Sequence, residues 1–142
     1  MSPVAKFLIG LAAVALAGWV HHDPMGNGEA LIGRIEAQAR QTVAATQVPG
    51  VDVRLGRDPL SRSATFSGEA DAFQREGQGE LKGLNDRVRD VEGVSNVRWA
   101  GEGGAAAIPL LLEVLLQLLA AYLAGLAIAW LLFGRRRREG FY

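Results

Sequence analysis

The pattern of hydrophobic and polar residues divides the chain into two apolar blocks with a mixed stretch between them. The first block, residues 4–20, carries Lys6 as its only charge, and the second, residues 105–133, carries only Glu113. A helix needs about 20 apolar residues to cross the hydrocarbon core of a bilayer. The second block offers 25 residues from Pro109 onward, so we expect a transmembrane helix over residues 107–134.

The first block allows two interpretations. Ala15, Leu16 and Ala17 form a small-residue site at which a signal peptide could be cleaved before Gly18. The apolar run nevertheless continues past this site to Val20, as in an uncleaved anchor. We therefore prefer an N-terminal transmembrane anchor over residues 1–20 and keep the signal peptide as the alternative.

Positive charges mark one flank of each block. Lys6 lies at the start of the first block, and a basic tail over residues 135–142 follows the second, with Arg135, Arg136, Arg137 and Arg138. Such residues favour the cytoplasmic side, where they also meet anionic lipid. The pattern predicts a two-pass protein of a bacterial inner membrane, with both termini in the cytoplasm and the region between the helices in the periplasm.

A helical period opens the mixed stretch, after a linker over residues 21–27. Asn27 is a candidate cap for a helix over residues 28–46, which stops near Pro49-Gly50. One face collects its apolar side chains: Leu31, Ile35, Ala39, Thr42 and Val43, with Ile32 beside them. Charged residues, Glu36 among them, fall mostly on the opposite face, where we expect solvent.

Two strands, a weaker helix and a third strand follow. Residues 51–55 and 63–70 have the alternation and composition of strands and predict a hairpin. Three glycines between positions 77 and 83 weaken the next helix by about 1 kcal/mol each relative to alanine. We therefore expect a loop over residues 76–80, a firm helix over residues 84–91 and a last strand over residues 94–99.

This order predicts an α+β domain over residues 28–100, in which two helices cover one face of a three-stranded sheet. Alternation directs these strand residues into the core: Val51, Val53, Leu55 and Phe66. The helix faces centred on Ile35, Leu84 and Val88 should close the core. A glycine-rich linker over residues 101–106 then leads to the second membrane helix.

The element order and two short motifs resemble the BON domain of bacterial envelope proteins. Residues 65–70 (TFSGEA) are similar to its V-x-L-x-G-x-V strand, and residues 91–97 (VEGVSNV) to its V-x-G-V-x-x-V turn and strand. Residues 77–82 depart from the regular second helix of that family. With the preceding anchor, the arrangement also resembles the N-terminal region of some OmpA-family envelope proteins.

The resemblance covers residues 28–99 and implies a domain that binds membranes or phospholipids and supports envelope integrity. It carries no catalytic set. Gly68 and Gly93 match the typical glycines of the family, and their expected role, like that of Gly50, is to turn the backbone.

Composition and charge narrow the function classes further. The 142 residues include no cysteine, and residues 21–104 carry 10 basic against 13 acidic residues. Without a basic excess, nucleic acid is not an expected partner. Adjacent His21 and His22 lack further clustered ligands for a metal, and no phosphate-binding loop or nucleophile triad is present. We expect no enzyme activity, no cofactor and no metal.

The second membrane helix has a polar and small-residue face. Glu113 is costly inside a membrane, so it either reaches the outer interface or faces protein or water. At four-residue spacing it is followed by Gln117, Ala121, Gly125 and Ala129. Small residues let helices approach closely and polar ones bond across them. We expect this face to contact either a second copy or the first anchor, through Gly10, Ala13 and Ala17, while leucines such as Leu115 and Leu119 face lipid.

Two functions fit these observations. In the first, a non-enzymatic inner-membrane protein presents its domain to the periplasm, where the domain binds phospholipid, an envelope polymer or a partner protein. In the second, the chain is a small accessory subunit of a larger membrane complex, assembled through the face from Glu113 to Ala129. Membrane lipid is an expected partner in both cases, together with a membrane protein or a second copy.

Overall fold

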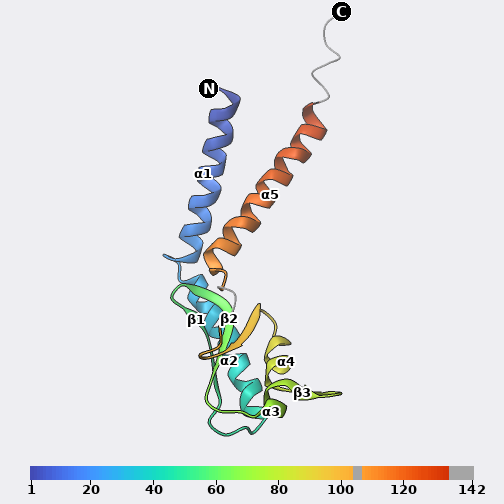
Figure 1. Ribbon diagram of the computed structural model, residues 1–142. Helices are drawn as coiled ribbons and strands as arrows, with labels where there is room; N and C mark the ends of the chain where they lie inside the picture. Colours follow the sequence, from blue (N-terminus) through green and yellow to red (C-terminus); the bar gives the residue numbers. More distant parts are fainter. Residues whose placement is uncertain (104–106, 135–142) are drawn as a thin grey trace, which may run out of the picture. The chain divides into compact units, whose positions relative to one another are not determined.

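The computed structural model describes residues 1–103 and 107–134, and the chain divides into two units (Figure 1). One unit contains the two apolar helices. The other, Gly26–Leu110, contains the sheet. The predicted basic tail, with Arg135 to Arg138, lies outside the described residues.

Two helices are long and apolar enough to cross a membrane: α1 (Pro3–His22) with 20 residues and α5 (Leu110–Phe133) with 24. Ser2 begins α1 by accepting a hydrogen bond from the amide of Ala5 at 3.1 Å, with Pro3 in the first turn. The helix continues without a break through Ala17 and Gly18. Both helices fit a two-pass membrane protein, in agreement with the sequence.

The contact between α1 and α5 is made at glycines of α1. The ring centroids of Tyr122 and Phe7 lie 5.7 Å apart, and the Tyr122 hydroxyl donates to the Phe7 carbonyl oxygen at 3.1 Å. A side chain at Gly10 would collide with the Tyr122 hydroxyl, and a Cβ atom at Gly18 would stand 2.7 Å from Leu118 Cδ1. Both glycines therefore allow an approach that a larger residue would block.

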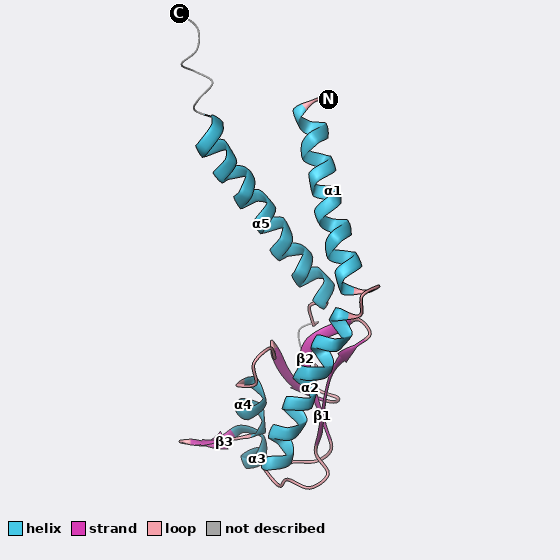
Figure 2. Ribbon diagram, turned by 180° about the vertical axis from the view of Figure 1, so that it is seen from behind, coloured by secondary structure: helices cyan, strands magenta, loops and turns pink. Residues whose placement is uncertain are grey.

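The second unit is an α+β domain (Figure 2). Its helices are α2 (Asn27–Ala45), α3 (Ala72–Glu76) and α4 (Leu84–Arg89). Its sheet has the order β1-β2-β5, from β1 (Asp52–Arg57), β2 (Leu60–Ser67) and β5 (Asn96–Trp99). Strands β1 and β2 are antiparallel, and β2 and β5 are parallel. The α+β class and the three-stranded sheet confirm the prediction.

One face of the sheet forms the core with α2 and α4. The register pairs Val53 with Phe66 and Leu55 with Ala64, so these four side chains point to the same face, and all are buried. Buried residues of the helices meet them: Ile32, Ile35, Ala39, Val43, Leu84 and Val88. The predicted core residues Val53, Leu55, Phe66, Ile35, Leu84 and Val88 are confirmed, and Val51 is half-buried against them.

The start and the inner face of α2 differ from the prediction. Asn27 is the first helical residue, and Gly26 occupies the cap position with φ of 67°, so Asn27 is not the cap. Ile32 is fully buried, whereas Leu31, predicted to face the core, is 37% exposed. Successive residues of a helix point about 100° apart, so only one of this pair can face the sheet.

Glu36 on α2 is also buried, although the sequence placed it on the solvated face. Its Oε2 accepts a hydrogen bond from the Leu55 amide at 3.0 Å, and its Oε1 pairs with Arg40 at 3.1 Å and with Arg57 at 3.3 Å. Arg40 Nε donates in turn to the Val53 carbonyl oxygen at 3.2 Å. Side chains of α2 thus bond the backbone groups of edge strand β1, which would otherwise be open to another strand.

The glycine-rich segment forms a hairpin where the sequence predicted a loop. Strands β3 (Gly77–Gln78) and β4 (Leu81–Lys82) pair between α3 and α4. Gly77 has φ of 75°, and a side chain at Gly83 would collide with the Gly77 amide and the Arg75 carbonyl. The close approach of these two backbone segments requires glycine at both positions.

Candidate functional site

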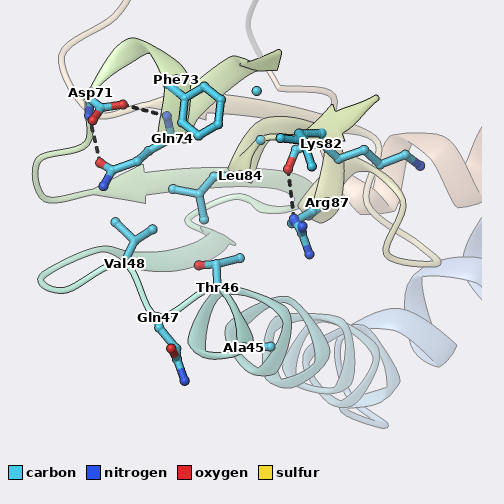
Figure 3. A pocket seen from close by; sticks show the side chains of 13 residues that line it. Ala45, Thr46, Gln47, Val48, Asp71, Phe73, Gln74, Lys82, Leu84 and Arg87 are labelled. Atoms are coloured by element: carbon cyan, nitrogen blue, oxygen red, sulfur yellow. Dashed lines mark hydrogen bonds between the residues drawn. The ribbon is translucent and has the colours of Figure 1, made fainter. Parts of the chain in front are cut away.

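A groove of about 510 Å³ lies within the α+β domain, at the carboxyl end of α2 (Figure 3). The residues that end α2 line one side. The start of α3, the β3–β4 hairpin and the first two turns of α4 line the other. Leu84 lies between the two sides and is 1% exposed, so the groove has an apolar floor that belongs to the core.

α3 places an aromatic side chain on the groove. Asp71 accepts a hydrogen bond from the Gln74 amide at 2.7 Å, while the Gln74 side chain accepts one from the Asp71 amide at 3.0 Å. This reciprocal cap fixes a helix that has only five residues and buries none of them. Phe73, between the two capping residues, remains 52% exposed.

Contacts with α4 and α3 hold the hairpin in place. Lys82 Nζ lies 2.5 Å from Asp90 Oδ2. Arg87 Nε donates to the Lys82 carbonyl oxygen at 2.9 Å (Figure 3). Asn85 of α4 donates to Glu76 Oε1 of α3 at 2.8 Å and so ties together the two helices that flank the hairpin. Leu81, at the end of this fixed hairpin, is 64% exposed. The groove therefore presents two large apolar side chains on walls that are tied to the domain.

Trp99 supports these walls from inside the domain. It is 3% exposed and stacks on Phe66, with ring centroids 4.7 Å apart. Its Nε1 donates to Asn85 Oδ1 at 2.9 Å, and the Arg75 guanidinium lies 4.0 Å above its ring. One aromatic residue of β5 thus fixes a residue of α4 and a residue of α3.

The two cations of the groove are engaged differently. The hydrogen bond that Lys82 donates to Asp90, together with the negative charge of Asp90, raises the pKa of Lys82 above its usual value. Arg87 forms no ion pair among the described residues, and its Nε bond to a carbonyl leaves the rest of the guanidinium for another group. Arg87 is therefore the cation that can receive an anion here.

The predicted face on α5 is not the face that contacts α1. Gln117, Ala121, Gly125 and Ala129 are exposed, and a Cβ atom at Gly125 would meet nothing within 4 Å. Glu113 is half-buried. The contact instead uses Leu115, Leu118 and Tyr122 of α5.

The corresponding face of α1 also differs from the prediction in part. Gly10 lies in the contact, but Ala13 and Ala17 are exposed, and Gly18 takes the place expected for them. Leu115, predicted to face lipid, lies 3.3 Å from the position of a Cβ atom on Gly18. The α1 contact thus leaves Gln117, Ala121, Gly125 and Ala129 exposed.

The remaining predicted residues have simpler surroundings. Gly50, Gly68 and Gly93 all have positive φ, at 77°, 103° and 96°. A side chain at Gly68 would collide with the Gly50 carbonyl, so the two turns that flank the β1–β2 hairpin touch each other. His22 Nδ1 lies 2.6 Å from Asp23 Oδ1, and no group of three or more metal-ligating side chains lies together in the described part of the chain.

Sequence reasoning missed Phe73, Leu81 and Arg87 as site residues. The exposure of Phe73 and Leu81 depends on the β3–β4 hairpin, which forms where the sequence predicts a loop. One signal was present: two large apolar residues flank a run of glycines where a regular amphipathic face cannot continue.

Comparisons with protein-family models, with curated proteins and with solved structures find no match to this chain.

Proposed function

We propose that this chain is a non-enzymatic, two-pass protein of a bacterial inner membrane that presents a binding domain to the periplasm. Lys6 and the four terminal arginines support cytoplasmic termini. The unbroken helix through Gly18, and its contact with Leu118, support retention of α1 as an anchor rather than its removal as a signal peptide.

The groove at the end of α2 carries this proposal. Two exposed apolar side chains, Phe73 and Leu81, stand beside a cation on walls fixed by capping, ion pairing and an aromatic core contact. Such concave sites with a few convergent polar groups are typical binding sites. The ligand classes expected from the BON-like motifs are phospholipid, an envelope polymer or a partner protein, and the role is support of the envelope.

Occupancy of the groove can be tested because the chain has no native cysteine. Phe73→Cys and Leu81→Cys each place one thiol on the groove, and Arg54→Cys places one on β1, where the Arg54 side chain is 73% exposed. We expect a maleimide to label the two groove thiols several-fold more slowly in native membranes than in the purified chain, and the Arg54→Cys thiol equally in both. If each of the three thiols is labelled at the same rate in native membranes as in the purified chain, a bound ligand is excluded.

A second candidate function is that of an accessory subunit in a larger membrane complex. The observation in its favour is that the α5 face of Gln117, Ala121, Gly125 and Ala129 is not used by α1. The mass of the chain extracted in a mild detergent separates the two functions. A stoichiometric larger assembly favours the accessory subunit, and a monomer or dimer favours the binding domain.

A further inference from the structure

We infer that the groove binds a segment of a partner protein in which an apolar side chain stands next to a carboxylate, and that Arg87 receives this carboxylate. The inference rests on the proposed function, because it names the partner of the same groove. Of the three ligand classes, phospholipid, envelope polymer and partner protein, it selects the partner protein. The selection depends on the charges and the exposed side chains around the groove.

The apolar part of the inference depends on Phe73 and Leu81. These side chains are 52% and 64% exposed, although the backbone around each is fixed by the Asp71–Gln74 cap and by the Lys82–Asp90 pair. A fixed, exposed aromatic and aliphatic pair loses little conformational freedom on binding. Arginine is one of the residues that dominate protein–protein binding, and phenylalanine is enriched in the buried centres of interfaces.

The charge around the groove argues against an anionic membrane as the ligand. An adjoining cleft of about 430 Å³ shares Leu81, Lys82 and Arg87 with the groove. Together the two are lined by three acids and two bases and carry a net charge of −1: Asp71, Glu80, Asp90, Lys82 and Arg87. Segments that bind anionic lipid carry clusters of about 4–8 Lys or Arg residues instead.

Arg87 supplies the polar specificity. Lys82 already has a carboxylate partner in Asp90, whereas Arg87 uses Nε on the Lys82 carbonyl and forms no ion pair among the described residues. That bond fixes the guanidinium beside the hairpin (Figure 3). The two terminal nitrogens can then bind a carboxylate in the bidentate geometry that favours arginine over lysine.

Photocrosslinking of the full chain in native membranes tests this inference. A benzophenone side chain is placed at Phe73, at Leu81 and, as a control outside the groove, at Arg54. The expected result is a discrete, protease-sensitive protein adduct from both groove positions and none from Arg54. Arg87→Gln should lower the adduct yield at least about fivefold, and Arg87→Lys should lower it less, because lysine keeps the charge but loses the fork.

Other outcomes overturn the inference in distinguishable ways. A protease-resistant adduct with the mass of a lipid removes the protein partner but leaves a binding groove. A protein adduct that is insensitive to Arg87→Gln removes the carboxylate contact. If the groove positions give no more adduct than Arg54, and maleimide labels the groove thiols at the same rate in native membranes and in the purified chain, the proposed function is removed as well. Protection of the Phe66 amide from hydrogen exchange shows in each variant that the domain remains folded.

Discussion

Glu36 shows at the scale of one residue how a charge becomes part of the core. The residue is 7% exposed, and its carboxylate has three partners: the amide of Leu55 and the side chains of Arg40 and Arg57. A buried carboxylate without such partners would be too costly. The residue is therefore structural, and one of its partners, the Leu55 amide, lies on a strand 19 positions away in the sequence.

Replacement of Glu36 by alanine leaves the Leu55 amide buried without an acceptor. We expect Glu36→Ala to lower the free energy of unfolding by about 1–3 kcal/mol. Glu36→Gln should cost less, because an amide oxygen can still accept the hydrogen bond. Urea unfolding of a soluble fragment over residues 26–110 measures both. Glu29→Ala, at an exposed site on the same helix, should stay within about 0.5 kcal/mol of the parent.

Phe66 is the largest fully buried side chain of the domain and stacks on Trp99. Phe66→Ala should lower the free energy of unfolding by about 3–5 kcal/mol, because it removes apolar surface and leaves a cavity. The same fragment serves, and it extends to residue 110 because Leu110 packs into this core. A loss under about 0.5 kcal/mol would be typical of a surface site and would contradict the register.

The Lys82–Asp90 pair gives the hairpin a dependence on alkaline pH. Because Asp90 raises the pKa of Lys82 above 10.5, the pair stabilises the folded state fully below that value, and this contribution is lost as pH rises through the folded pKa. The effect is small because the pair is exposed to solvent. Asp90→Asn should return the pKa of Lys82 towards 10.5, as measured by NMR titration of its side chain. An unchanged pKa would show that the pair does not form.

At the scale of elements, the contact between α1 and α5 depends on where the glycines lie. Gly10 and Gly18 are eight positions apart on α1, so they fall near the same side of the helix and accept Tyr122 and Leu118. Within a bilayer, leucine gains nothing from leaving lipid, so close packing and the Tyr122 hydrogen bond must supply the specificity.

Gly10→Ile should separate α1 from α5, because its side chain would occupy the place of the Tyr122 hydroxyl. The measurement is the distance between spin labels on Ala13→Cys of α1 and Ala121→Cys of α5, because both positions are exposed and the labels do not enter the contact. Gly125→Ile is the matched control within the chain, because its position is open, and the distance should stay unchanged.

Gly125→Ile has a separate expected effect between copies or subunits. If the face of Gln117, Ala121, Gly125 and Ala129 contacts another helix, the added side chain should reduce intermolecular crosslinking from Ala121→Cys. Leu126→Cys, at a position away from this face, should not crosslink. Equal crosslinking from both positions would mean that the face has no specific neighbour.

At the scale of the whole molecule, the two apolar helices and the charges at their ends determine the expected topology. Alkaline phosphatase should be active when fused after Arg57 and inactive when fused after Tyr142, because only the region between the helices should leave the cytoplasm. The mass of the purified chain should also include residues 1–17, because we expect no cleavage before Gly18. Phosphatase activity at the C-terminus would reverse the orientation.

The sequence by itself determined the parts of this protein that depend on local pattern. Runs of about 20 apolar residues predict spanning helices wherever they occur. Period-2 and period-3.6 alternation placed Val53, Leu55, Phe66, Leu84 and Val88 in the core, because these periods follow from backbone geometry alone. The three-stranded α+β order followed from the same periods.

Only the tertiary structure decided the features that depend on residues distant in sequence. Glu36 is buried because Leu55 and Arg57 reach it, and the glycine-rich segment forms a hairpin because Gly77 and Gly83 meet across it. The same hairpin exposes Leu81 and places Arg87 beside it, which creates the groove. Likewise, the residues of α5 that touch α1 are set by Gly10 and Gly18, more than 90 positions earlier in the chain. A pattern along one segment cannot specify which distant backbone will satisfy its polar groups or occupy the space beside its glycines.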